Sequence, residues 1–152
     1  IKINGIYEKI GNEKLAGLVS VYELNNYKKR FLGNLVDGKK QGTWKEFYPN
    51  KRILVENYID GKLDGSVSLF FKNGQKEWRY NYANGVLNGS YSKWYSNGEK
   101  ATHGYFENGK PVGIWAWWDE NGKLTNKENY PPKTNSIIKG HNQYTDKVDV
   151  IK

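Results

Sequence analysis

The stretch from Tyr58 to Gly74 reads YIDGKLDGSVSLFFKNG, which is a turn, an apolar run and a second turn. The same arrangement returns along the chain. Its second glycine stands at Gly42, Gly65, Gly89 and Gly113, in steps of 23, 24 and 24 residues, and the closing asparagine follows eight residues later in each copy. A fixed period of this size indicates one supersecondary unit that is stacked repeatedly.

Each copy contains two short runs that predict β-strands. The runs are rich in Val, Ile, Tyr, Phe and Trp, and Gly or Asn bounds them. The first runs are 43–48, 66–71, 90–95 and 114–118, and the second runs are 52–59, 75–82, 100–106 and 123–130. Because the links are short at both ends, neighbouring strands must be antiparallel. The sequence therefore predicts an all-β fold, an elongated single-layer antiparallel meander of stacked β-hairpin repeats that is twisted or curled.

The two kinds of link predict two kinds of turn. Asn and Gly both tolerate positive φ, as a type I′ turn requires. We therefore expect type I′ turns at the closing Asn-Gly pairs, which are Asn73-Gly74, Asn97-Gly98 and Asn121-Gly122. The opening link, of the form Asp/Asn-Gly-x-x-x-Gly, is longer and predicts a wider hairpin.

The repeat pattern divides the chain into three parts. Residues 1–36 read as a degenerate N-terminal repeat or cap, in which Gly17 takes the place of the second glycine. Residues 37–130 hold four regular repeats. Residues 131–152 begin with Pro131-Pro132, which cannot donate to a strand ladder, and they form either a closing strand near 147–151 or a partly disordered tail. The sequence contains no Met, so we expect its natural start to precede residue 1.

Aromatic residues recur in columns of the repeat. Five residues past the second glycine stand Phe47, Phe70, Trp94 and Trp118, and two residues past it stand Trp44, Val67, Tyr91 and Trp115. The two positions differ in parity, so an unbroken strand places them on opposite faces. Either both faces of the sheet are aromatic, or a bulge realigns the two columns.

The aromatic columns supply the candidate residues for partner binding. The rings could serve only as the core of a thin repeat protein. Alternatively, one row could lie open as a binding surface, because a single layer has no second sheet to cover its other face. The densest run is Trp115-Ala116-Trp117-Trp118. On this basis we predict a partner-binding site at Trp94, Trp115, Trp117, Trp118 and Tyr91.

The chain is basic, with 24 Lys and Arg against 16 Asp and Glu and a net charge of +8. Lysines stand at the turns: Lys39, Lys62 and Lys110 follow an opening glycine, and Lys123 follows a closing one. They could simply keep the hairpin tips hydrated. The alternative is a strip that binds an anionic lipid surface or an acidic protein. Nucleic acid is the weakest of these partners, because no nucleic-acid motif accompanies the lysines.

The sequence offers little for catalysis, and we expect a non-enzymatic protein without cofactor or metal. There is no Cys, and the two histidines, His103 and His141, stand in different contexts. No activated Ser, phosphate-binding loop or metal-spaced His pair appears. Asp60 and Asp64 share one turn and could hold a cation. Their equivalents in the next copy are Asn84 and Asn88, so turn geometry explains them better.

The string Tyr-x-Asp/Asn-Gly-x-x-x-Gly-x-aromatic-x-x-aromatic-aromatic-x-Asn-Gly resembles the MORN repeat family, in its bacterial variant form. Residues 58–74, 82–98 and 106–122 carry it well, residues 36–50 lack the final Gly, and residues 12–25 carry it faintly. The copies lack the dense Gly-x-Gly pattern of the common eukaryotic form. The resemblance implies a non-catalytic β-hairpin array that contacts proteins or membrane surfaces, with antitoxin-like proteins among the bacterial variants.

These observations lead to two expectations for function. The first is a protein-binding module, of antitoxin or immunity type, that masks a toxin or effector. The second is peripheral attachment to an anionic membrane or cell-envelope surface through the turn lysines. No run of about 18 apolar residues is present. We therefore expect a soluble protein, either in the bacterial cytoplasm or exported to the envelope.

Overall fold

The computed structural model describes residues 2–5, 17–22 and 29–131. Thirteen strands form one sheet, and eleven of them follow one another in chain order from β1 to β13. The short strands β6 and β9 lie off this path and pair with β5 and β8. The strands are β1 (Lys2–Gly5), β2 (Gly17–Tyr22), β3 (Lys29–Val36), β4 (Lys39–Phe47), β5 (Ile53–Ile59), β6 (Lys62–Leu63), β7 (Gly65–Phe70), β8 (Lys76–Ala83), β9 (Val86–Leu87), β10 (Gly89–Trp94), β11 (Lys100–Glu107), β12 (Lys110–Trp118) and β13 (Leu124–Tyr130).

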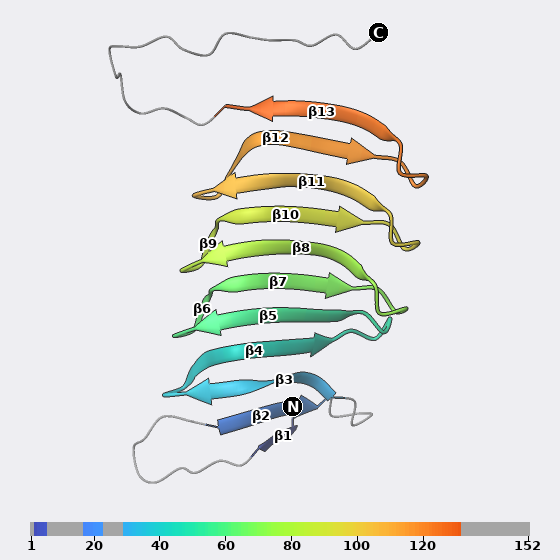
Figure 1. Ribbon diagram of the computed structural model, residues 1–152. Helices are drawn as coiled ribbons and strands as arrows, with labels where there is room; N and C mark the ends of the chain where they lie inside the picture. The colour runs from blue at the N-terminus through green and yellow to red at the C-terminus, as the bar shows by residue number, and fades with distance from the viewer. Residues whose placement is uncertain (1, 6–16, 23–28, 132–152) are drawn as a thin grey trace, which may run out of the picture.

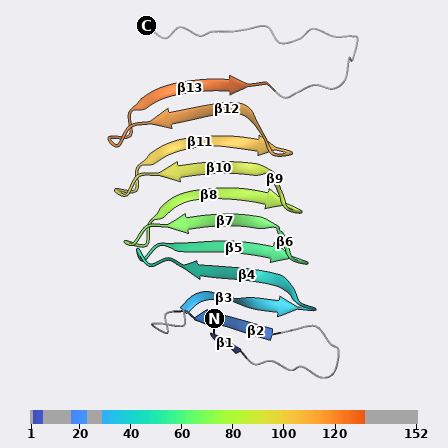
Figure 2. The same ribbon diagram turned by 180° about the vertical axis from the view of Figure 1, so that it is seen from behind.

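The predicted meander is confirmed. Every pair of neighbouring strands is antiparallel, from β1–β2 to β12–β13, and no helix occurs in the described part. Figures 1 and 2 show the strands side by side in a single layer, with no described element lying across either face. At about 4.8 Å per strand, eleven strands extend roughly 50 Å. The division into a degenerate N-terminal repeat, four regular repeats and a C-terminal part stays a prediction. Residues 132–152 lie outside the described residues.

The predicted assignment of turn types is wrong, because the two kinds of turn are exchanged. Positive φ at both central residues occurs in the opening links Asp37-Gly38, Asp60-Gly61, Asn84-Gly85 and Asn108-Gly109. These are the two-residue type I′ hairpins. In the closing links only the glycine has positive φ, as at Gly74 with φ 85°. The Gly74 N–H donates to the Phe71 carbonyl and the Phe71 N–H to the Gln75 carbonyl, so this loop has three residues.

A bulge lies in the second strand of each of the last three repeats, whereas β4 and β5 of the first repeat pair without one. Leu69 pairs with Trp78 and Phe70 with Lys76, so Glu77 is the extra residue. Ala101 and Thr125 take the same place in the next two repeats. The first strands β4 and β12 shift register against the preceding strand near Gly42 and Gly113, but they pair without a gap with the following strand from position two onward, so positions two and five stay on opposite faces. Both faces are therefore aromatic, and we name them the Trp115 face and the Trp118 face.

Hydrogen bonds between successive turns fix the spacing of the repeats. At the closing edge, the Asn73 amide donates to the Ser96 carbonyl at 3.0 Å and the Asn97 amide to the Glu120 carbonyl at 2.9 Å. At the opening edge, Gly85 N–H donates to the Leu63 carbonyl, and Gly61 and Gly109 repeat this bond. The second glycines 42, 65, 89 and 113 share positive φ. The last three copies are thus held to one another by the same contacts at both edges.

Candidate binding surfaces

The Trp115 face carries a packed row of rings across the middle of the sheet. Tyr80 and Tyr91 lie with ring centroids 4.5 Å apart, and Trp115 stacks on Tyr91 at 5.4 Å. Phe106 and Tyr130 meet the Trp115 ring edge-on at 5.1 and 6.0 Å. Burial among these rings, with Tyr80 adding to the effect, raises the pKa of Tyr91 far above its ordinary value. This phenol is therefore neutral and acts as a packing and hydrogen-bonding group.

Two tryptophans of this face lie flat against the backbone of the preceding strand. Trp115 is 8% exposed and Trp44 is 6% exposed. A Cβ atom on Gly104 would lie 2.1 Å from the Trp115 ring, and one on Gly33 would lie equally close to the Trp44 ring. Each indole donates to a carbonyl beside that glycine, Trp115 to Tyr105 at 3.2 Å and Trp44 to Asn34 at 3.0 Å. The two tryptophans anchor neighbouring strands to each other.

This glycine–tryptophan pairing was missed in the sequence, although the signal is present. In the repeats with Trp at position two, the residue nine positions before the second glycine is Gly33 or Gly104. In the two middle repeats, position two is Val67 or Tyr91, and the corresponding residue is Glu56 or Tyr80. The small residue therefore occurs only where the large indole must lie over it.

The Trp118 face is polar on the side of the opening turns and aromatic toward the closing turns. Two asparagine amides each donate to the backbone carbonyl of a serine in the next long strand. Asn57 donates to Ser66 and Asn81 to Ser90, both at 2.7 Å. Toward the closing turns lie Phe47, Phe70, Trp94 and Trp118, with the Lys100 ammonium 5.8 Å from the Trp118 ring centre. Trp94 and Trp118 are half-buried, so part of each ring is open.

The predicted partner-binding residues do not form one surface. Trp115, Trp117 and Tyr91 lie on the Trp115 face, where the rings of Trp115 and Trp117 are 6.2 Å apart. Trp94 and Trp118 lie on the other face. Each stands three residues after a ring of the Trp115 face in its own strand, Tyr91 or Trp115, and residues an odd number apart point to opposite faces. Trp115 is buried, whereas the other four are half-buried.

The predicted turn lysines lie at two different edges. Lys39, Lys62 and Lys110 are exposed at the opening turns, in β4, β6 and β12. The stem of Lys39 lies over Gly61 of the next turn, and Lys62 lies near Gly85 in the same way. Lys123 is exposed at the last closing turn, on the opposite edge. The first three lysines therefore form a row that Lys123 does not join.

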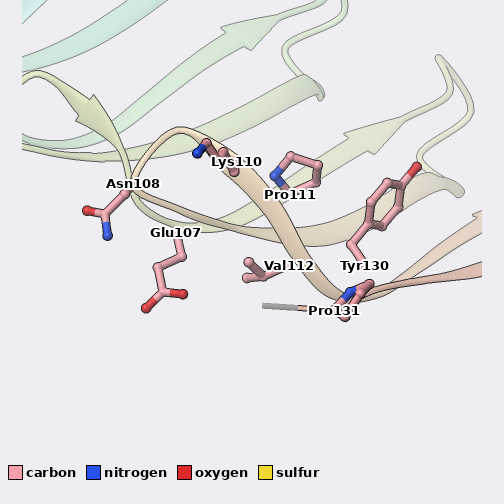
Figure 3. Close-up of a pocket in the computed structure, with 7 residues that line it drawn as sticks. All are labelled: Glu107, Asn108, Lys110, Pro111, Val112, Tyr130 and Pro131. Atoms are coloured by element: carbon pink, nitrogen blue, oxygen red, sulfur yellow. The ribbon is translucent and has the colours of Figure 1, made fainter. Parts of the chain in front are cut away.

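A pocket of about 580 Å³ lies where the last opening turn meets the end of β13. Figure 3 shows Val112, Pro111, Tyr130 and Pro131 along its wall, with Glu107, Asn108 and Lys110 around it. The wall is mainly apolar. Its chemistry therefore suits the binding of an apolar group.

Of the two acidic turn residues, Asp64 has a backbone partner for its carboxylate, whereas Asp60 bonds through its own backbone N–H. The Asn84 N–H donates to the Asp64 carboxylate at 2.9 Å, and the Asp60 N–H donates to the Gln41 side chain at 2.9 Å. Turn geometry therefore accounts for Asp64. Within residues 30–131 there is no group of three His, Cys, Asp or Glu side chains placed to hold a metal ion. No helix of the described part is long and apolar enough to cross a membrane.

His103 lies on the Trp118 face, where its Nδ1 is 2.9 Å from the Ser92 hydroxyl. Burial and the nearby Lys100 ammonium lower the pKa of His103 below its ordinary value of 6.5, while a hydrogen bond with the Tyr91 backbone acts in the opposite direction. At neutral pH the imidazole is therefore uncharged in the folded protein.

The stability of the fold should fall when His103 is forced to take up a proton. Between the lowered pKa of the folded state and 6.5, the unfolded chain binds more protons, so the free energy of unfolding rises with pH. We expect the melting temperature to decrease by a few degrees from pH 7.5 to pH 5. In His103→Gln the decrease should be smaller, as thermal melts followed by circular dichroism would show. Equal pH dependence in both proteins would contradict this assignment.

The family comparison agrees with this geometry. The MORN repeat variant family matches residues 40–60 and 111–130. In these two segments the chain is similar to the MORN repeat variant family. The two matched segments span β4–β5 and β12–β13, which are the two repeats with a tryptophan lying over a glycine. A comparison with curated proteins finds no match to the chain. MORN repeats generally form binding or membrane-interaction modules and are generally not enzymes.

Proposed function

We propose that this protein is a non-enzymatic protein-binding module whose partner covers one broad face of the sheet. The observation that supports this most is the single layer with half-buried rings on both faces. Trp117 and Tyr91 on one face, and Trp94 and Trp118 on the other, are neither fully packed nor fully exposed. Half-open rings gathered on an uncovered surface are typical of protein interfaces.

Within this proposal the partner is a toxin or effector, and the array masks its active surface in the manner of an antitoxin or immunity protein. The resemblance to variant MORN proteins of that kind supports this finer proposal. Trp115 acts as the anchor that fixes the sheet, while Trp117 or Trp118 makes the contact. The turn lysines steer an acidic partner toward the sheet.

Two single substitutions test the proposal, because neighbouring residues point to opposite faces. The tagged protein is used to capture a partner from extracts of its source cells, and the captured protein is then purified for affinity measurement. We expect either Trp117→Ala or Trp118→Ala, but not both, to weaken binding by tenfold or more, which is about 1.4 kcal/mol. Lys123→Ala serves as a control at the closing edge. If neither tryptophan substitution changes the affinity, the proposed site is wrong.

A second candidate function is attachment to an anionic membrane or envelope surface. The row of Lys39, Lys62 and Lys110 along one edge favours it, because each exposed lysine near an anionic surface contributes about 1 kcal/mol. We expect the triple Lys→Gln variant to lose sedimentation with phosphatidylserine vesicles at low salt. If the unaltered protein does not sediment with these vesicles, this second function is excluded.

A further inference from the structure

One row of directly paired residues crosses the Trp118 face at right angles to the strands. Val55 pairs with Ser68, Ser68 with Arg79, and Arg79 with Ser92. The row continues through His103, Ala116 and Lys127. Directly opposite residues of an antiparallel sheet share a face, so all of these side chains lie on the same side. Basic side chains stand in β8, β11 and β13, and small ones lie between them.

The small residues of the row lie low in the sheet. Ser68 and Ala116 are each 7% exposed, because the longer side chains beside them cover them. The basic residues are one repeat apart, which corresponds to two strands or about 9.6 Å. We name Arg79, His103 and Lys127 the basic row; Arg79 and Lys127 carry its charge, and the uncharged imidazole of His103 offers only hydrogen bonding at neutral pH.

The basic row has no acidic partner in the described part of the chain. The ion pairs found there are Arg30–Glu46, Lys40–Glu56 and Arg52–Glu77. Glu46, Glu56 and Glu128 lie on the Trp115 face, since they pair with Leu54, Trp44 and Trp115. Arg79 makes one hydrogen bond, at 3.4 Å to the Asn81 side-chain oxygen, and its buried Nε has no partner. A half-buried guanidinium without a counter-ion is costly, so this row suits an acidic ligand.

We propose that the basic row binds an extended acidic segment of a partner protein that runs across the strands. This inference rests on the proposed protein-binding function and names the chemistry of its partner. In the polyproline II conformation every third residue returns to the same face after about 9.3 Å, so acidic residues at every third position of such a segment match the spacing of the row. The aromatic column of Phe70, Trp94 and Trp118 runs parallel to it, two residues along each strand, and receives apolar side chains of the same segment.

The geometry favours a polypeptide over other anions. A nucleic-acid strand carries one charge about every 3.4 Å, which is far denser than the basic row. A flat lipid surface reaches the exposed turn lysines before it reaches a half-buried arginine in the middle of a sheet face. A carboxylate on a flexible segment can enter the row and form the bidentate contact that a guanidinium prefers.

The test uses a labelled fifteen-residue peptide with Glu at every third position. A peptide of the same composition with all its Glu residues contiguous is the comparison. Binding is measured by fluorescence anisotropy at pH 7.5 and low salt. We expect Arg79→Gln/Lys127→Gln to weaken binding of the spaced peptide about tenfold. Lys72→Gln/Lys93→Gln, which removes the same charge at exposed positions away from the row, should change it less than about twofold. Lys127→Gln alone, at an exposed position, is used if the double variant does not fold.

The outcomes separate this inference from its alternatives. Equal losses in the two double variants, or equal binding of the two peptides, would overturn it, because both indicate unspecific attraction. Stronger row-dependent binding of phosphatidylserine vesicles or oligothymidylate than of the peptide would assign the row to lipid or nucleic acid instead. A purified partner that binds Arg79→Gln/Lys127→Gln with unchanged affinity would leave the protein-binding function standing and refute the basic row alone.

Discussion

Replacing Gly104 with Ala is expected to lower the melting temperature by about 6 to 12 °C, which corresponds to roughly 3 kcal/mol in a chain of this size. The added Cβ would lie 2.1 Å from the Trp115 ring, so the indole must leave its place. Its stacking on Tyr91 and its hydrogen bond to the Tyr105 carbonyl would then be lost. Thermal melts followed by tryptophan fluorescence measure the effect.

A double-mutant cycle shows whether the loss comes from the tryptophan. In the repeat where Val67 occupies position two, the opposite strand carries Glu56 instead of glycine. We therefore expect Gly104→Ala to cost less than about 1 kcal/mol when Trp115→Val is already present. A cost of similar size in both backgrounds would show that the backbone of Gly104, and not the indole above it, is responsible.

Removing one whole repeat, residues 65–88, is expected to leave a folded and shorter array. The deletion joins Asp64 to Gly89, so β10 takes the place of β7 beside β5 and meets an equivalent register. Strands of the described part contact their neighbours in the sheet, and repeat arrays of this kind tolerate such changes. Small-angle scattering should report a maximum dimension shorter by about 10 Å.

Removing half a repeat serves as the control for this deletion. Without residues 65–76, Asp64 would be followed by the second strand of a repeat, which would then run in the wrong direction for its partners. Hydrogen bonds between turns, such as Asn73 to Ser96, would also be absent. We expect loss of the cooperative unfolding transition. A half-repeat deletion as stable as the whole-repeat deletion would contradict the stacked-hairpin account.

The period in the sequence was sufficient to predict the sheet, because identical spacing of glycines and asparagines requires identical hairpins. It did not identify the turns, since Asn-Gly suits both a two-residue type I′ loop and a three-residue loop with a bulged glycine. The first strands β4 and β12 also begin earlier than expected, at Lys39 and Lys110. The opening link is therefore mostly strand, with a kink at Gly42 or Gly113, where φ is 67° and 66°.

The surfaces were less predictable than the sheet, because they depend on pairing between strands. Parity alone placed Trp115 and Trp118 on opposite faces, but a bulge between them in the first strand would have reversed that result. The irregularities of the first strands β4 and β12 lie near Gly42 and Gly113, and the other bulges fall in second strands. The basic row of Arg79, His103 and Lys127 is visible in the sequence as a column of period 24, yet its small neighbours Ser68 and Ala116 come from other strands.

The two tryptophans that lie over glycines also allow unfolding at the two ends of the sheet to be followed by intrinsic fluorescence. Trp44 and Trp115 are buried three repeats apart, one toward each end of the described array. Their emission shifts to the red when water reaches the ring, so Trp44→Phe and Trp115→Phe variants separate the two signals. Fraying of either end can thus be followed without an attached dye. If a bound partner reduces fraying at one end only, that end of the sheet contains its binding site.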